Sequence, residues 1–546
     1  MKRRHFIKLA TATTAIGLLP SDVKAMFSAF DLASNCGDLS NRKLVLINLI
    51  GGNDGLNTVI PLNNYDQYRN LRPNIGIRDT GSQAYIKLDS TLPDNQQVGL
   101  HPALTGLKAL YDSDQLRIIQ SVGYPSQNGS HFASKDIYST GNDGKSWSNG
   151  KNSGWIGRFL ENHYIDDLTK SYPLAIQMGL SKTELGFHGA KEHGLSINLT
   201  GQDPKGFYTQ LSALSDNALT QTTIDTHFLK ELQYIIDTTK KSNTYSKAIS
   251  EAFDKGKNAL SYPDNKLSDQ LKTVARLISG GLESKIYFVS IGGFDTHDQQ
   301  IESANDINGT HNKLLTQVST AITAFMKDLR QQALDDDVVG LTFSEFGRKI
   351  KENGNLGTDH GKAAPMFVFG KPIRGGVSGT NVNLAEATDA NNYQLETVQF
   401  DYRQTFATLL QDFMGSSNGT LDKTFYNHSS NQSFADLKIA PLVKGAFSVA
   451  AGCIPDSSES DTTSGSAQHW NLFPNPFKSR LLLSADEEVA QLYYRVYTAE
   501  GSLLFESSKE VVNQRTALEW PSLAPGIYFL QIESALGTET HKLIKE

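Results

Sequence analysis

The chain has 546 residues, which is too long for one ordinary domain and predicts two to four. Apolar residues make up 38% and charged residues 20%, the composition of a water-soluble globular protein. The formal net charge is −7 and no basic stretch follows the first residues, so nucleic acid is excluded as an expected partner.

The first residues have the form of an export signal. Lys2-Arg3-Arg4-His5-Phe6-Ile7-Lys8 carries positive charge, and the apolar run over residues 9–19 is too short to span a bilayer. Paired arginines followed by Phe-Ile-Lys resemble the twin-arginine signal, which exports folded proteins across the inner membrane. We expect a signal over residues 1–27, the twin-arginine translocase as a partner and no transmembrane segment in the mature protein. An ordinary amphipathic helix is the alternative.

The two cysteines, Cys36 and Cys453, flank the body of the chain. In an oxidising compartment they form either one disulfide or two free thiols, and the sequence leaves both open. Neither lies near other metal-ligating residue types at the required spacing, so a cysteine-bound zinc is not expected.

Short apolar runs alternate with longer helical periodicities between residues 40 and 445. The runs cover residues 44–50, 116–120, 286–291, 338–343 and 366–369, and the helical segments cover residues 101–111, 225–236, 267–278, 311–332 and 402–413. Continuous apolar runs of this length are typical of strands buried on both faces of a parallel sheet. Strands alternating with helices predict a doubly wound α/β domain, whose functional residues gather beyond the carboxyl ends of the strands.

The last part of the chain has a different pattern. A polar linker rich in Ser and Thr is expected over residues 446–470, and several short β-rich runs follow over residues 471–546. Close spacing and turn signals such as Pro525-Gly526 predict a small antiparallel β-sandwich. Phe473-Pro474-Asn475-Pro476-Phe477, Leu523-Ala524-Pro525-Gly526-Ile527-Tyr528-Phe529 and the basic tail resemble a type A sorting domain of the type IX secretion system. The resemblance implies that the type IX secretion machinery is a partner and that the protein is secreted or attached to the cell surface. A carbohydrate-binding or adhesive module is the alternative.

Polar residues of metal-ligating types lie at the ends of four predicted strands. The motifs are Gly51-Gly52-Asn53-Asp54-Gly55, Gly292-Gly293-Phe294-Asp295-Thr296-His297, Ser344-Glu345-Phe346-Gly347-Arg348 and Gly357-Thr358-Asp359-His360-Gly361. Carboxylates and imidazoles in this combination suit zinc, manganese or calcium. Each motif alone has an ordinary explanation, such as an Asx turn at Asp54. Their joint occurrence at strand ends of one domain favours a shared site.

A fifth motif, Asn128-Gly129-Ser130-His131-Phe132, enters a helix-like segment. The Ser130 hydroxyl at a helix start is either an N-cap or a nucleophile favoured by the helix N-terminus and a nearby metal. Taken alone, the motif favours the cap.

Together, the motifs resemble the alkaline phosphatase and sulfatase superfamily. More closely, Gly-Gly-Asn-Asp-Gly-Leu-Asn, Ser-His-Phe, Gly-Gly-Phe-Asp-Thr-His, Ser-Glu-Phe-Gly-Arg and Gly-Thr-Asp-His-Gly resemble the exported family catalogued as domain of unknown function 1501, over about residues 43–415. The superfamily implies two divalent metals, zinc first, with calcium or manganese as alternatives. The implied site has Asp54, Asp359 and His360 on one metal, Asp295 and His297 on the other, Glu345 as a further ligand, Ser130 as nucleophile, His131 as ligand or acid, and Arg348 as an anion clamp.

One element of the phosphatase pattern is missing. The only later histidine in the body, His428, lies in a different context, so one metal or none stays open. The leading prediction is an exported metal-dependent hydrolase of phosphate or sulfate esters, reaching its destination through the periplasm. The alternative is a non-catalytic secreted or surface protein with the same fold. A carbohydrate-active enzyme is a third class, but no carboxylate pair in recognisable context supports it.

Overall fold

The computed structural model describes residues 39, 41–145, 153–190, 196–199, 227–426, 432–439 and 441–444, and residues 470–545 with short gaps. The chain divides into two compact units, residues 1–458 and 459–546. The expected signal over residues 1–27, both cysteines, His428 and residues 446–469 of the expected linker lie outside the described residues.

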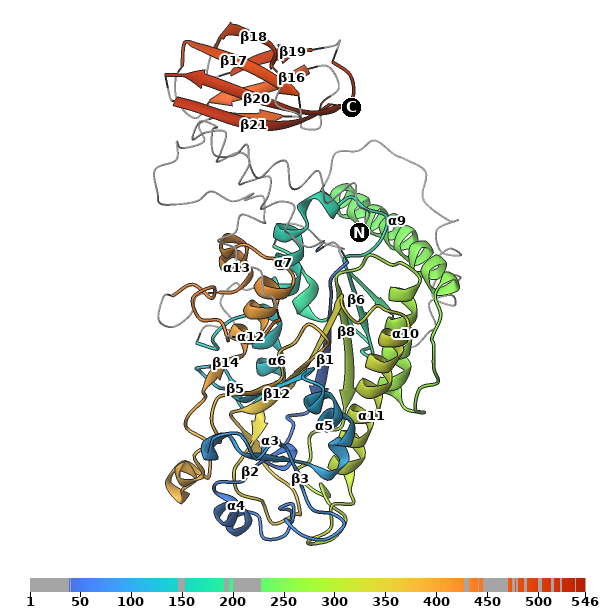
Figure 1. Ribbon diagram of the computed structural model, residues 1–546, viewed down its shortest axis with the longest axis vertical. Helices are drawn as coiled ribbons and strands as arrows, with labels where there is room; N and C mark the ends of the chain where they lie inside the picture. The colour runs from blue at the N-terminus through green and yellow to red at the C-terminus, as the bar shows by residue number, and fades with distance from the viewer. Residues whose placement is uncertain are drawn as a thin grey trace, which may run out of the picture. The chain divides into compact units, whose positions relative to one another are not determined.

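A nine-stranded sheet organises the larger unit (Figure 1). The strand order is β13-β5-β12-β9-β1-β8-β6-β7, with β14 also paired to β5. The strands are β1 (Lys43–Ile50), β5 (Leu116–Gly123), β6 (Ala175–Met178), β7 (Ser196–Leu199), β8 (Ile286–Gly292), β9 (Val338–Phe343), β12 (Ala364–Phe369), β13 (Gly376–Ser378) and β14 (Phe400–Asp401). All pairings of these strands are parallel except those of β12, which runs antiparallel to β5 and β9. The mostly parallel α/β sheet is confirmed, but the expectation that residues 366–369 form a parallel strand is wrong.

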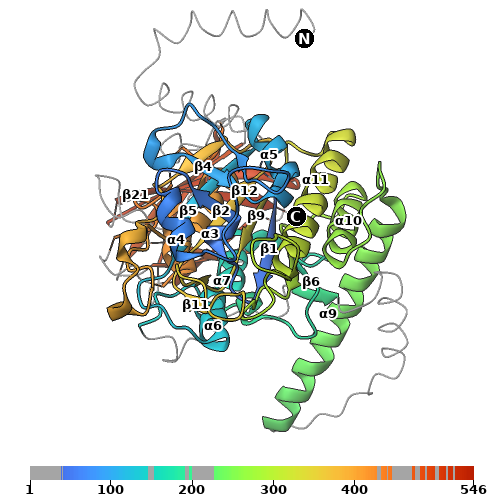
Figure 2. The ribbon, with the colours of Figure 1, turned by 90° about the horizontal axis from the view of Figure 1, so that it is seen from below.

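Helices cover both faces of the sheet because the side chains of β1 alternate between two cores. Val45 and Ile47 pack with α5, α10 and α11, whereas Leu44 and Leu46 pack with α6, α7 and α12. The bounds are α5 (Thr105–Asp112), α6 (His131–Thr140), α7 (Trp155–His163), α9 (His227–Lys255), α10 (Lys266–Ser279), α11 (Thr310–Gln331) and α12 (Tyr402–Thr408). Figure 1 shows the two groups on opposite sides of the sheet, and Figure 2 shows α9 beside α10 from a second direction. The doubly wound arrangement is confirmed.

The predicted helical segments are present with shifted ends. The segment 101–111 begins with a 3-10 turn at Pro102–Leu104, and the segment 402–413 ends in a π-helical turn at Leu409–Phe413. The sequence did not reveal β6, β7, β13 and β14, because none of them is longer than four residues. None of the described helices is long and apolar enough to cross a membrane.

The antiparallel direction of β12 brings the polar motifs to one edge of the sheet. Asp54, Asp295 and Glu345 follow the parallel strands β1, β8 and β9. His360 precedes β12, and the start of β12 lies at the edge where β9 ends because the two run in opposite directions. The residues that follow β1, β8 and β9 and the residues that precede β12 therefore lie at the same edge of the sheet.

The smaller unit is an antiparallel β-sandwich, as predicted. One sheet has the order β15-β16-β19 and the other β18-β17-β20-β21. The strands are β15 (Trp470–Phe473), β16 (Arg480–Ala485), β17 (Gln491–Thr498), β18 (Leu503–Glu510), β19 (Arg515–Glu519), β20 (Gly526–Ser534) and β21 (Gly537–Lys545). Residues of both sheets, including Leu483, Val496 and Leu530, form its core. Strand β15 begins at Trp470, the last residue of the expected linker.

Candidate metal centre

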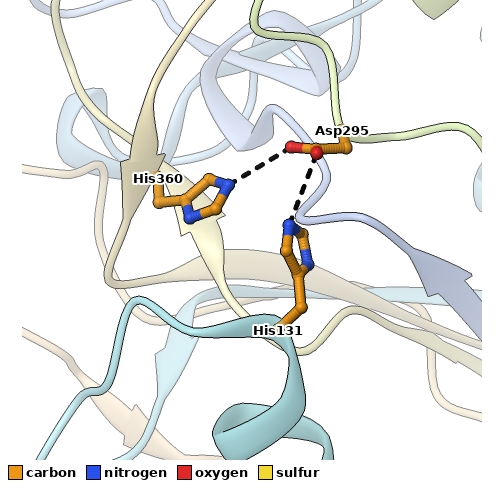
Figure 3. Close-up of side chains that lie close together, drawn as sticks. All are labelled: His131, Asp295 and His360. Carbon is orange, nitrogen blue, oxygen red and sulfur yellow. Dashed lines mark hydrogen bonds and ion pairs between the residues drawn. The ribbon is translucent and has the colours of Figure 1, made fainter.

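Three side chains from separate motifs form a cluster with metal-ligating spacing (Figure 3). His131 begins α6, Asp295 follows β8, and His360 lies in the short strand β11 (His360–Gly361). His131 Nε2 lies 3.5 Å from Asp295 Oδ2, and His360 Nε2 lies 3.2 Å from Asp295 Oδ1. One ligand atom from each residue lies within 4.8 Å of the others. Ligand atoms around a tetrahedral zinc lie about 3.3 Å apart, so the three groups would have to draw slightly closer together to hold such an ion.

The second nitrogen of each imidazole is held by the protein. His131 Nδ1 lies 2.9 Å from Glu345 Oε1, and His360 Nδ1 lies 2.7 Å from the carbonyl oxygen of Gly129. A carbonyl oxygen only accepts hydrogen bonds, so His360 Nδ1 donates to it. His360 Nε2 also lies within hydrogen-bonding distance of the Asp295 carboxylate, and a metal ion would take the place of that contact. The Glu345 carboxylate also accepts from the backbone N–H of Gly51, at 2.9 Å and 3.2 Å from its two oxygens. A ligating histidine commonly has such a carboxylate or carbonyl partner on its other nitrogen.

Arg348 fixes the position of Asp295. Its Nη2 donates to Asp295 Oδ1 at 2.8 Å and to the carbonyl oxygen of Phe294 at 2.9 Å. Its Nε donates to Gly52 at 2.6 Å, and its Nη1 donates to Thr358 at 2.8 Å. The side chain has no solvent exposure, and its donors are directed to protein oxygens. Buried Arg348 therefore holds the loops at the strand ends together through these hydrogen bonds. It does not lie at the surface, where the expected anion clamp would contact a substrate.

The charges of the cluster suit a cation. Partial burial raises the pKa of Asp295, but hydrogen bonds from Arg348 and His360 outweigh it and lower the pKa to about 2. The carboxylate is therefore ionised at neutral pH. The hydrogen bond to Glu345 raises the pKa of His131, whereas burial lowers the pKa of His360. Because metal ligation needs neutral imidazoles, protons compete with a metal mainly at His131.

His297 and Asp359 lie next to the cluster. His297 Nδ1 is 2.8 Å from Asp295 Oδ1, so the structure brings this expected pair together. Asp359 accepts hydrogen bonds from Lys349 Nζ at 3.0 Å and Asn353 Nδ2 at 3.2 Å. Burial raises the pKa of Asp359, but these two contacts outweigh it and leave that pKa lowered. The negative charge of Asp359 is thus compensated by Lys349.

Asp54 points into the protein interior, away from the role expected for it. Arg72 Nη1 lies 2.8 Å and 2.7 Å from its two carboxylate oxygens, and Gln300 Nε2 donates to it at 2.6 Å. Neither Asp54 nor Arg72 has any exposed side-chain surface. The expected grouping of Asp54 with Asp359 and His360 is not assembled, because Arg72 already neutralises Asp54. Arg72 and Gln300 belong to none of the motifs, and no signal in the sequence pointed to them.

Ser130 lies exposed immediately before α6. Its side chain makes no capping hydrogen bond, although its backbone N–H donates to Asn128 Oδ1 at 2.9 Å. The capping role favoured by the motif alone is therefore wrong, and the hydroxyl is free. Tyr124 holds the preceding loop, since its hydroxyl accepts from the backbone N–H of Asn128 at 2.9 Å and lies 2.8 Å from Ser134 Oγ.

Two family matches divide the chain between them. Residues 41–424 match the family described as "Protein of unknown function (DUF1501)". The chain belongs to this family. Residues 471–546 match the secretion system C-terminal sorting domain, which indicates secretion or a place at the cell surface. The DUF1501 match includes every residue of the candidate centre.

No curated protein matches this DUF1501 chain. A protein in the alkaline phosphatase superfamily from Vibrio parahaemolyticus is 9% identical, with 88% of this chain and 82% of that chain covered and a TM-score of 0.32. The lipoteichoic acid synthase LtaP from Listeria monocytogenes is 9% identical, with 72% and 80% covered and a TM-score of 0.30. A DUF3244 family protein with an immunoglobulin-like β-sandwich fold from Bacteroides vulgatus is 17% identical, with 14% and 85% covered and a TM-score of 0.13. Similarity at these TM-scores is weak, and membership in DUF1501 rests on the family match.

Proposed function

We propose that this DUF1501 protein is an exported hydrolase of phosphate or sulfate esters that uses one divalent metal. The observation that carries the proposal is the convergence of His131 Nε2, His360 Nε2 and an Asp295 oxygen, with both Nδ1 atoms held by protein acceptors. Two imidazoles and one carboxylate form a zinc site with a fourth position open for substrate. Calcium and manganese are the alternatives, but both prefer oxygen ligands.

Ser130 is the proposed nucleophile, because its hydroxyl is exposed, uncapped and adjacent in the chain to His131. A bound zinc polarises an ester oxygen and favours the anionic form of a nucleophile. Ser130 Oγ would lose its proton to solvent and bond to the phosphorus or sulfur atom, and the bond to the alcohol would break as the alcohol takes up a proton. Water would later release the acid and return a proton to Ser130. His297 is half-exposed and bonded to Asp295 through Nδ1, so its Nε2 is available to exchange a proton with the leaving alcohol.

The test is a screen of phosphate and sulfate esters with the purified protein loaded with zinc, calcium or manganese. We expect hydrolysis with at least one metal, and we expect Ser130→Ala to lower kcat by more than about a hundredfold while metal content is retained. Ser90→Ala, at an exposed serine in another part of the chain, is the matched control. If the metal-loaded protein hydrolyses none of the esters, the non-catalytic alternative holds.

For the export route, we propose passage through the twin-arginine translocase into the periplasm and then through type IX secretion machinery. The sorting-domain match over residues 471–546 supports the second step, and the Arg3-Arg4 pair supports the first. A chain truncated before Trp470 should accumulate in the periplasm, and the double variant Arg3→Lys/Arg4→Lys should accumulate in the cytoplasm. Arrival of the truncated chain in the medium would contradict the proposed sorting role.

A further inference from the structure

The buried side chain of Gln300 connects three segments that carry sequence motifs. Gln300 has no exposed surface, and it is not itself part of a motif. Its Nε2 donates to Asp54 Oδ2 at 2.6 Å. Its Oε1 accepts from the hydroxyl of Thr296 at 3.0 Å and from the hydroxyl of Thr358 at 3.1 Å. One amide thus joins the segment after β1, the segment after β8 and the segment before β11.

The buried ion pair decides which end of the Gln300 amide faces which partner. The Asp54 carboxylate is paired with Arg72 at 2.7 Å, and an ionised carboxylate only accepts hydrogen bonds. Gln300 Nε2 therefore faces Asp54, and Oε1 faces the two threonine hydroxyls. A side-chain amide oxygen has two lone pairs, so it can accept from both hydroxyls at once. An asparagine at position 54 would still offer an oxygen to Gln300 Nε2.

Both threonines lie next to residues of the metal centre. Thr296 lies between Asp295 and His297, in the loop that follows β8. Thr358 lies two residues before His360, in the loop that precedes β11. We call these two segments the ligand loops. The 3.2 Å distance between Asp295 Oδ1 and His360 Nε2 spans from one ligand loop to the other, so it depends on how the loops are held together.

The ligand loops also contact each other directly. The backbone N–H of Thr358 donates to the carbonyl oxygen of Thr296 at 3.0 Å. A Cβ at Gly357 would lie 2.4 Å from the carbonyl oxygen of His297, so the two backbones are as close as a glycine allows. The rings of His297 and His360 have their centroids 4.6 Å apart. This ring pair reports the separation of the ligand loops.

We infer that Gln300 is a positioning residue that holds the two ligand loops at metal-binding spacing before a metal arrives. Loops that are already ordered lose less conformational entropy when they bind, so this connection strengthens metal binding without any contact to the metal. The relevance to ester hydrolysis rests on the proposed function, but the positioning itself requires neither hydrolysis nor Ser130.

Gln300→Met tests the inference in the full-length protein, because methionine has a similar length but makes none of the three hydrogen bonds. We expect zinc affinity in calorimetric titration to fall about ten- to hundredfold, the range for groups that hold metal ligands in place. In the metal-free protein, the nuclear Overhauser effect between the ring protons of His297 and His360 should weaken. Gln411→Met is the control, because Gln411 is equally buried and donates to Asn418 at 2.6 Å outside the centre. It should change neither measurement.

A pair of substitutions at Thr358 tests the inference through a smaller change. Thr358→Val keeps the shape of the side chain and removes the hydroxyl, whereas Thr358→Ser keeps the hydroxyl and removes the methyl group. Valine should lower zinc affinity about three- to tenfold, the effect of losing one hydrogen bond, and serine should restore most of it. Restoration by serine separates positioning from packing, because a packing role would favour valine. A thermal melt of each variant checks that it is folded.

The outcomes separate this inference from the proposed function. If Gln300→Met and Thr358→Val keep both the zinc affinity and the ring contact, or if Gln411→Met lowers them equally, the positioning role is overturned. Ester hydrolysis by the unsubstituted protein would then still support the proposed function. Conversely, a protein that hydrolyses no ester but loses the ring contact in Gln300→Met keeps the positioning role and removes the hydrolase.

Discussion

Asp54 is neutralised inside the protein by Arg72, whose Nη1 lies 2.7 Å and 2.8 Å from its two carboxylate oxygens. Arg72 also donates to the carbonyl oxygens of Ile350 at 2.7 Å and Lys349 at 2.8 Å, which anchors the segment that carries Arg348. A guanidinium thus supplies the positive charge that the superfamily resemblance assigns to a metal at Asp54. This relationship favours a centre with one metal.

Arg72→Ala should destabilise the protein strongly, because it leaves a fully buried carboxylate without its partner. We expect a loss of about 3–5 kcal/mol in the free energy of unfolding, measured by denaturant titration. Arg78→Ala, at an exposed arginine nearby, should change it by less than about 0.5 kcal/mol. Equal losses in the free energy of unfolding for the two substitutions would show that the buried Asp54–Arg72 pair does not stabilise the fold more than an exposed arginine does.

The same pair makes stability depend on pH. Burial raises the pKa of Asp54, but the charges of Arg72 and His311 and the hydrogen bonds from Arg72 and Gln300 together outweigh it, so the folded-state pKa lies below the ordinary value of 3.8. The stabilisation is present above pH 3.8 and is lost as pH falls through the folded-state pKa. The double variant Asp54→Asn/Arg72→Met should show a smaller loss of stability in that acid range.

Metal binding should depend on the three clustered residues and not on Asp54. We expect about one equivalent of zinc per chain by elemental analysis, and His360→Ala should weaken zinc binding by more than about a hundredfold in calorimetric titration. His188→Ala, at an exposed histidine, is the control. Asp54→Asn should leave the stoichiometry at one. Two equivalents in the unsubstituted protein, falling to one in Asp54→Asn, would establish the two-metal arrangement instead.

Zinc affinity should rise with pH because His131 must lose its proton to bind. Its hydrogen bond to Glu345 raises its pKa above the ordinary 6.5, so protons compete with zinc to a higher pH than at a free imidazole. In the metal-free protein, this contact stabilises the fold below pH 6.5, and the stabilisation is lost as pH rises through the folded-state pKa.

Glu345→Gln should therefore lower the pKa of His131 in an NMR titration and shift the rise in zinc affinity to lower pH. The glutamine keeps an acceptor oxygen for His131 Nδ1, so the fold of the centre should survive. An unchanged His131 titration would show that the 2.9 Å contact with Glu345 does not control the proton.

Gly51→Ala should disturb the centre without changing any ligand. Gly51 has φ +123°, and a Cβ at this position would lie 2.3 Å from the backbone nitrogen of Asp295. The loop that carries Asp295 would have to move, so we expect weaker zinc binding as well as lower stability. Gly281→Ala also has a positive φ, +82°, but nothing lies within 4 Å, so it should cost about 1–2 kcal/mol and leave zinc affinity unchanged. Both properties are measured by calorimetric and denaturant titration.

Residue patterns predicted the main strands and helices because burial on both faces leaves continuous apolar runs, as in β1 and β8. They did not predict the direction of β12, since its residues are as apolar as those of a parallel strand. The motifs nominated Asp295, His297 and His360 as ligands. The division of ligands between two metals came from the resemblance alone, and the structure groups His360 with Asp295 and His131 instead.

The sequence by itself determined the chemistry available at the strand ends, the division into an α/β body and a β-sandwich, and the sorting motifs. These features follow from local composition and periodicity, which neighbouring residues encode directly. Only the tertiary structure decided which polar groups face one another. Arg72 reaches Asp54 from a segment without any motif, and His360 reaches Asp295 because β12 runs against its neighbours. Such pairings depend on strand direction and side-chain orientation across distant segments, and no local pattern records either.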